Sequence, residues 1–146
     1  RGTGLAAMNY MLDTNTCIYL MTDWHPERQV RILDQLDKLA TDENLYLSSI
    51  VVFELSYGAQ KGRWRKANLA LLEEFLFDFI IAPFDDKAAH ASGEIRTTLE
   101  KKGGPIGPMD TLIAGHAMSM GMPLVTHNIG EFSRVAGLKV ENWAGE

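Results

Sequence analysis

The sequence predicts an α/β fold in which a short parallel β-sheet is covered by helices on both faces. Short apolar runs alternate along the chain with longer segments whose apolar residues recur at helical spacing. Glycine, proline and capping residues separate the two kinds of segment. With 146 residues and a hydrophobic content of 46%, the chain can build one core.

Each element follows from a local pattern. Tyr10–Leu12 is an apolar run that stops at Asp13, so we expect a first strand and then a polar turn. Pro26 fits the first turn of a helix that continues to about residue 40. The same patterns predict, in order, a strand at 45–47, a helix at about 50–60, a helix through 67–76, a strand at 79–84, a helix at 86–99, a loop at 103–108, a helix from 108 to about 121, a strand at 124–125 and an edge strand at 138–140.

The ends of the helices are predicted by residues that satisfy free backbone groups. Ser48 or Ser49, and Asp85 or Asp86, can accept hydrogen bonds from the first backbone N–H groups of the helices that follow them. Pro108 fits the first turn of the next helix, where no backbone donor is needed. We therefore place helix starts at these three points.

Residues 8–146 are expected to form a single domain. The preceding segment 1–7, RGTGLAA, is small and polar and leads to a plausible initiator at Met8, so we interpret it as a cloning remnant. Apolar runs stay well short of the roughly 20 residues that cross a bilayer, which predicts a cytoplasmic protein without membrane contact. Cys17 is the only cysteine, and we assign it to packing.

The charge balance is unfavourable for contact with nucleic acid. The formal net charge is −5, from 14 basic and 19 acidic residues, whereas phosphate binding is mostly electrostatic. Such a protein must attract phosphate locally, through cations held by carboxylates or through basic patches. Two patches are candidates, although solvated helix ends explain them equally well. The first is Lys61, Arg63, Arg65 and Lys66, and the second is Lys101 and Lys102.

Three acidic residues occupy positions where a charge is costly. Asp13 closes the first strand, at the sheet edge where ligands bind in folds of this class. Glu54 falls on one helical stripe with residues 51, 55 and 58, and Asp110 shares its face with residues 113, 114 and 117. A lone carboxylate among core-facing residues costs several kcal/mol unless it is paired or coordinated.

A divalent cation would explain the three acids together. Their like charges would repel one another at one sheet edge, and Mg²⁺ or Mn²⁺ prefers carboxylate oxygen. The alternative is that Asp13 and Asp110 cap helices while Glu54 pairs with an arginine such as Arg96.

Two further polar residues follow the fourth predicted strand. Asn128 can ligate a cation or position a water, and Glu131, three residues later, can act as a fourth carboxylate. The histidines show no metal-ligand spacing and are left out of the site; His116, on a helix, is expected in the core or at an interface.

Three segments carry a family resemblance: MLDTNT at 11–16, SSIVVFELSYG at 48–58 and PIGPMDTLIAGHA at 105–117. They resemble the PIN-domain toxins of bacterial VapBC toxin–antitoxin pairs, and the likeness runs from about Met8 to Trp143. The resemblance implies a PIN-like fold, a homodimer, a cognate VapB-type antitoxin, dependence on Mg²⁺ or Mn²⁺, and cleavage of structured RNA.

Residue by residue, the resemblance assigns the three metal-binding acids to Asp13, Glu54 and Asp110. It assigns supporting hydroxyl groups to Thr14 and Thr126. In-line hydrolysis at such a site leaves a 5′-phosphate and a 3′-hydroxyl.

The fourth acidic position of the family is often Asp, whereas this chain has Asn128. A second strongly held metal would therefore depend on Glu131 or on the RNA phosphate. The subgroup that the chain resembles most acts on tRNA, including the anticodon loop of initiator tRNA.

Two other functions remain open. Asp13 and the three residues after it nearly match the DxDxT start of haloacid-dehalogenase-like phosphatases, in which Asp13 would be the nucleophile, but Asn15 replaces the acid that would transfer the proton. A non-catalytic binding module could instead use the acidic pocket to receive a partner's arginine or lysine.

Overall fold

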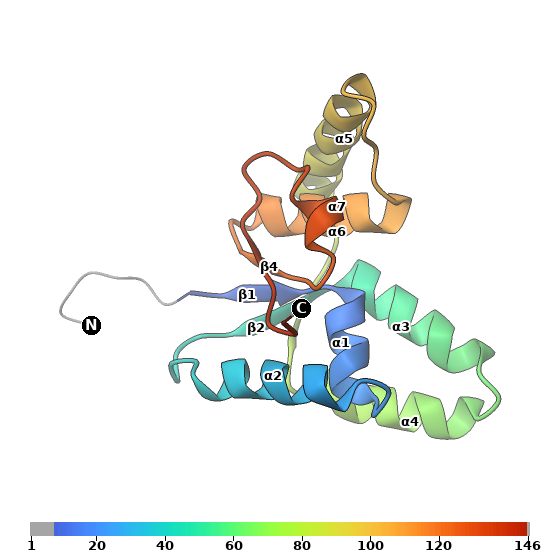
Figure 1. Ribbon diagram of the computed structural model, residues 1–146. Coiled ribbons are helices and arrows are strands. Elements are labelled where there is room, and N and C mark those ends of the chain that lie inside the picture. The colour runs from blue at the N-terminus through green and yellow to red at the C-terminus, as the bar shows by residue number, and fades with distance from the viewer. Residues whose placement is uncertain (1–7, 146) are drawn as a thin grey trace.

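A five-stranded parallel sheet forms the centre of the computed structural model, which describes residues 8–145 (Figure 1). The expected cloning remnant at 1–7 lies outside these residues. The strands pair in the order β3-β2-β1-β4-β5, and each of the four pairings is parallel. They are β1 (Tyr10–Leu12), β2 (Leu45–Ser48), β3 (Ile80–Ala82), β4 (Leu124–Val125) and β5 (Val140–Glu141).

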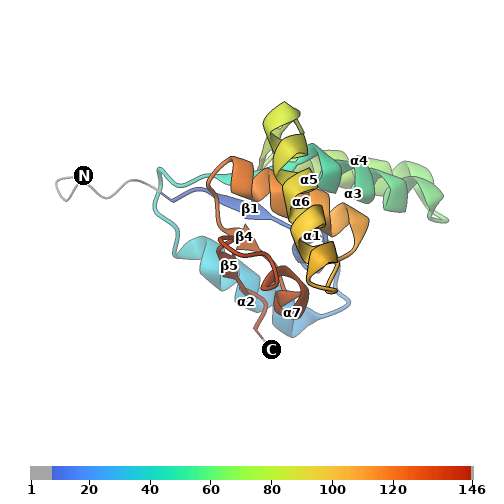
Figure 2. The ribbon, with the colours of Figure 1, turned by 90° about the horizontal axis from the view of Figure 1, so that it is seen from above.

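Helices cover both faces of the sheet, which confirms the predicted α/β architecture. In Figure 1, α5, α6 and α7 lie on one side of the strands and α1, α2 and α4 on the other, while α3 and α4 form a hairpin that projects from the body in both views (Figures 1 and 2). Within residues 8–145, no helix is long and apolar enough to span a membrane. The helices are α1 (Thr14–Met21), α2 (Pro26–Asp37), α3 (Ser49–Lys61), α4 (Arg65–Leu76), α5 (Asp86–Lys101), α6 (Pro108–Ser119) and α7 (Ile129–Phe132).

The strand order changes direction between β1 and β4. From β1 the chain adds β2 and β3 on one side, and it returns to add β4 and β5 on the other. Such a switch point opens a crevice at the carboxyl ends of the strands, where α/β proteins bind ligands. Asp13 follows β1 and Thr126 follows β4, so both lie at this crevice.

The core confirms two predictions about single residues. Cys17 is fully buried, as its assignment to packing requires. His116 is also buried, and its Nδ1 lies 2.7 Å from Oγ of Ser48, the residue that caps α3. The largest fully buried apolar side chains come from the first and last thirds of the described chain: Met11, Leu12, Ile32, Leu47, Ile113, Leu124 and Phe132.

The expected polar turn after the first strand is wrong, because α1 begins there directly. The backbone N–H of Thr16 donates to Oδ1 of Asp13 at 2.9 Å, so Asp13 is the N-cap of α1. The polar residues 14–16, which suggested a turn, form the first helical turn under this cap. The single-turn helix α7 also lies where no helix was predicted.

Several element ends differ from the prediction. β3 ends at Ala82 rather than at residue 84, because Pro83 has no N–H with which to continue the ladder. The edge strand is Val140–Glu141 rather than 138–140, since pairing with β4 aligns Val140 with Leu124. Helix α2 stops at Asp37, three residues early.

Candidate metal-binding active site

The acids predicted from the sequence gather at the carboxyl edge of the sheet. Asp13 follows β1, Glu54 lies on α3, Asp110 lies in the first turn of α6, and Glu131 lies on α7. The negative charges of Asp13, Glu54 and Glu131 each help to raise the pKa of Asp110. Helices that are far apart in the sequence therefore bring four carboxylates into one cluster.

Asp13 is held rigidly at the centre of this cluster. Its side chain is only 3% exposed. Besides the Thr16 N–H on Oδ1, the Thr126 hydroxyl donates to Oδ2 at 2.6 Å, which joins the ends of β1 and β4. Burial raises the pKa of Asp13, the bonds from Thr126 and Thr16 oppose that shift, and the charge of Glu54 adds to it. Both carboxylate oxygens of Asp13 are therefore held in place by hydrogen bonds.

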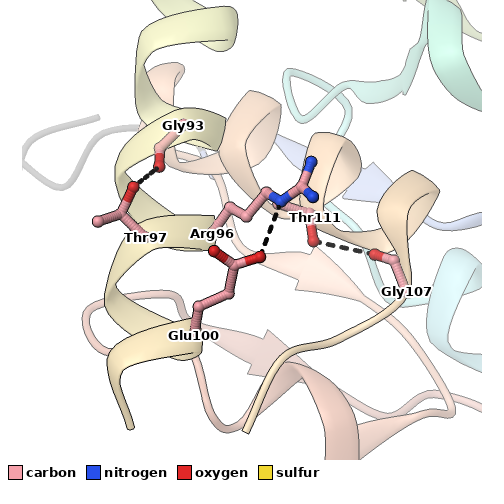
Figure 3. A network of polar contacts seen from close by, with 6 residues as sticks. All are labelled: Gly93, Arg96, Thr97, Glu100, Gly107 and Thr111. Carbon is pink, nitrogen blue, oxygen red and sulfur yellow. Dashed lines mark hydrogen bonds and ion pairs between the residues drawn. The ribbon is translucent and has the colours of Figure 1, made fainter. Parts of the chain in front are cut away.

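Glu54 is held by a hydroxyl group and not by an arginine. Thr14 Oγ1 donates to Oε1 of Glu54 at 2.5 Å. The alternative partner, Arg96, pairs instead with Glu100, at 3.1 Å between Nε and Oε2 (Figure 3). Glu54 is only partly buried and Gly58 is exposed, so the core-facing stripe expected for this helix is wrong at these two positions. Glu54 lines an open groove.

Asp110 is not a helix cap, because Gly107 occupies the N-cap position of α6. The Thr111 hydroxyl donates to the Gly107 carbonyl at 2.9 Å within this first turn (Figure 3). Burial, then the negative charges of Glu131, Asp13 and Glu54, and finally a hydrogen bond with Glu131 raise the pKa of Asp110 to about 7. The ionised carboxylate of Asp110 is thus costly without a compensating charge.

Glu131 links the site to its surrounding loops. Its Oε1 accepts the Gly107 N–H at 2.8 Å, and its Oε2 accepts Nδ2 of Asn128 at 2.6 Å. The bond from Gly107 is the main reason that the pKa of Glu131 is lowered. The backbone N–H of Asn128 in turn donates to Thr126 Oγ1 at 2.9 Å, and Thr126 holds Asp13. The backbone donor of Gly107 was not anticipated, because no side-chain pattern marks it.

A divalent cation fits this site by charge and by donor chemistry. Three carboxylates raise the pKa of a fourth, and carboxylate oxygens are the donors that hard cations prefer. In the described part of the chain, however, no three His, Cys, Asp or Glu side chains converge closely enough to hold a metal ion as they stand. Coordination would therefore require the carboxylates to draw together, and the partly buried Glu54 has room to move.

Without divalent cations, raising the pH from 6 to 8 should lower the melting temperature of the protein more than that of its Asp110→Asn variant. The pKa of Asp110 is raised to about 7 in the folded chain, from about 3.9 in an unfolded one. Protonation of Asp110 therefore stabilises the fold fully below the unfolded value, and this contribution disappears as the pH rises through 7. Calorimetry in EDTA at both pH values tests this; parallel profiles for the two proteins would refute it.

Comparison with known proteins identifies the family. The PIN domain family matches residues 10–138. The chain is 40% identical over 136 residues to the tRNA(fMet)-specific endonuclease VapC of Salmonella typhimurium, covering 93% of this chain and 98% of that protein. It is 43% identical over 136 residues to Ribonuclease VapC2 of Rickettsia felis, with the same coverage of 93% and 98%.

Solved structures agree with the sequence comparison. VapBC2 from Rickettsia felis, bound to a DNA fragment from its promoter, superposes with a TM-score of 0.82 at 42% identity, over 93% of this chain and 99% of that one. VapBC-1 from nontypeable Haemophilus influenzae gives a TM-score of 0.85 at 33% identity, over 93% and 98%. The chain therefore belongs to the PIN-domain family, within the VapC branch of VapBC toxin–antitoxin systems.

Proposed function

We propose that this VapC-type ribonuclease cleaves tRNA in a reaction that depends on Mg²⁺ or Mn²⁺, with the anticodon loop of initiator tRNA as its favoured target. The observation that supports metal dependence is the carboxylate cluster, in which burial, together with the negative charges of the neighbouring carboxylates, raises the pKa of Asp110 to about 7. The Salmonella relative, named for its action on tRNA(fMet), supports the choice of substrate.

In this proposal Asp13, Glu54 and Asp110 hold the cation. A bound Mg²⁺ or Mn²⁺ would supply an activated water and would neutralise negative charge on the scissile phosphate. Thr126 fixes Asp13, so this carboxylate is oriented before the substrate arrives, whereas Glu54, which accepts from Thr14, would move toward the cation. Such preorganisation lowers the cost of assembling the site during the reaction.

Asn128 and Glu131 complete the site on the side of α7. Because Asn128 donates to Glu131 through Nδ2, its side-chain oxygen is left to accept a hydrogen bond from a water or to approach a cation. Glu131 holds the start of α6 through the Gly107 N–H, and this contact keeps Asp110 facing the cluster. Glu131 is therefore proposed to position its neighbours and to serve as a fourth carboxylate.

The direct test is cleavage of purified initiator tRNA with Mg²⁺, with Mn²⁺ and with EDTA. Cleavage should require the cation, should occur in the anticodon loop, and should leave 5′-phosphate and 3′-hydroxyl ends, as hydrolysis by an activated water predicts. Elongator tRNAs serve as the control for substrate choice. Undiminished cleavage in EDTA would exclude the metal-dependent mechanism, and cyclic-phosphate ends would exclude an activated water as the nucleophile.

The same assay tests the proposed partner. The VapBC structures contain relatives of this chain in complex, which supports a cognate VapB-type antitoxin here as well. We expect the antitoxin to suppress cleavage by placing a cationic side chain among the carboxylates, so that Mn²⁺ weakens the complex. An affinity that does not change with Mn²⁺ would argue for inhibition elsewhere. The homodimer stays a prediction, which light scattering can check.

A further inference from the structure

The tip of the α3–α4 hairpin concentrates positive charge on a protein whose net charge is −5. The basic tip consists of Lys61, Arg63, Arg65 and Lys66, and all four side chains are exposed. The ion pairs between described side chains are His25–Glu27 and Arg96–Glu100, so no carboxylate in that part of the chain forms an ion pair with the basic tip. Its charge is available to an external anion.

Exposed aromatic rings accompany these cations. Trp64, Tyr57 and Phe53 are 68%, 59% and 58% exposed. Lys61 Nζ lies 4.7 Å from the centre of the Tyr57 ring, and the Arg63 guanidinium lies 5.3 Å from that of Trp64. Cations for phosphate and flat rings for base stacking are the combination with which proteins bind single-stranded and looped RNA.

The basic tip is ordered by contacts across the hairpin. Asn68 Nδ2 donates to the Ala59 carbonyl at 3.4 Å, and Arg65 donates to Gln60 Oε1 at 3.3 Å. A Cβ on Gly62 would lie 2.7 Å from Nδ2 of Asn68, so glycine leaves the room in which the Asn68 side chain packs against the end of α3. The basic tip therefore has a defined structure before a ligand binds.

A groove connects the basic tip to the carboxylate cluster. It has a volume of about 820 Å³ and is lined mostly by apolar and aromatic side chains, with Thr14, Glu54 and Lys61 among its polar residues. Seven residues of α3 separate Glu54 from Lys61, which corresponds to roughly 10 Å at 1.5 Å per residue. The hairpin projects beyond the carboxyl edge of the sheet (Figure 1), so a strand leaving the cluster along the groove would reach the basic tip.

Stability alone does not account for the charges at the start of α4. Arg65 and Lys66 occupy its first turn, which contains no acid, and the N-cap residue Trp64 makes no side-chain capping bond. The helix dipole favours acids at this end. Lys61, at the end of α3, is where the dipole favours a cation. Solvated helix ends thus explain Lys61 but not Arg65 and Lys66.

We propose that the basic tip and its exposed rings bind the backbone and unpaired bases of the RNA substrate, away from the bond that is cleaved. The proposal rests on the proposed function, because the occupant is the RNA on which the carboxylate cluster acts. The cluster itself repels phosphate unless a cation is present, so a positively charged surface at the far end of the groove supplies the attraction that an acidic protein otherwise lacks.

The test compares two variants that each lose two positive charges, Lys61→Gln/Arg65→Gln at the basic tip and Lys101→Gln/Lys102→Gln at the end of α5. Binding of labelled tRNA is measured by anisotropy at several salt concentrations, with Asp110→Asn in every protein to prevent cleavage. Each lost phosphate contact should reduce the slope of log K against log salt by about 0.7 to 0.9. The tip variant should bind roughly tenfold more weakly with a slope smaller by about 1.5, whereas the α5 variant should keep the wild-type slope.

A third variant separates stacking from charge. Trp64→Ala should weaken binding severalfold without changing the salt slope, because stacking on an indole releases no counterions. In proteins that retain Asp110, the tip variant should raise KM for tRNA and leave kcat near the wild-type value, since its residues do not touch the reacting phosphate.

Two results would overturn the proposal. One is equal weakening by the tip and α5 variants, which would show that only net charge matters. The other is a tip variant that binds and cleaves tRNA like wild type but fails to bind the antitoxin, which would assign this surface to a protein partner. A wild-type chain that neither binds nor cleaves RNA would instead refute the proposed function, and the inference would fall with it.

Discussion

Asp110→Asn should lower ribonuclease activity by roughly 100-fold or more while leaving the fold intact. The carboxylate of Asp110 faces three others, so its negative charge is tolerated only when it contributes to holding a cation. A neutral amide keeps the size of the side chain and removes that charge. Asp13→Asn and Glu54→Gln should have effects of the same order, because each removes a charge from the same cluster.

Asn128→Ala should cost less, roughly tenfold, as expected for a residue that orients a ligand without adding charge. The structure also predicts the outcome of the substitution Asn128→Asp. Its new carboxylate would lie against Glu131, which Asn128 now contacts at 2.6 Å, so that variant should stay active with a shifted metal optimum. The measurement is cleavage of an initiator-tRNA anticodon stem-loop. If Asn128→Ala folds normally and is as inactive as Asp110→Asn, Asn128 is a principal catalytic residue and this ranking is wrong.

The candidate site could be found from the sequence because charges in costly positions are visible there. Asp13 ends an apolar run, and Asp110 shares a helix face with residues that prove to be buried. The contacts that hold the acids could not be found in this way. The bond from the Gly107 N–H to Glu131 joins positions 24 residues apart and involves a backbone donor. Likewise, Thr126 reaches Asp13 across 113 residues.

Periodicity predicted most elements of the fold but not their order or their ends. The apolar runs located five strands, yet the arrangement β3-β2-β1-β4-β5 depends on pairings between distant segments. Helix α1 was missed because its first turn is polar, although a cap and three polar residues are also how a helix begins. Where a strand ends depends on its partner strand and, for β3, on Pro83. The apolar pattern of one segment alone therefore predicted β3 as longer than it is.

Gly115→Ala should destabilise the protein strongly, because α5 and α6 touch at this residue. A Cβ on Gly115 would lie 2.0 Å from Oγ of Ser92 and 2.7 Å from its Cα and backbone N. A serine rotamer change can relieve the first contact but not the other two, so α5 must move away from α6. Overpacking of this kind costs about 1–3 kcal/mol or more, which should lower the melting temperature by roughly 5 to 10 °C for a chain of this size.

Gly93→Ala, on the neighbouring helix α5, is the matched control for this prediction. No atom lies within 4 Å of the Cβ it would add, and the position is exposed, so it should raise stability by up to about 1 kcal/mol through helix propensity alone. Because α6 also carries Asp110, Gly115→Ala should reduce ribonuclease activity even at temperatures where the protein stays folded. Thermal unfolding of both variants decides the matter: a Gly115→Ala protein as stable as the Gly93→Ala protein would mean that the two helices can separate without loss of stability.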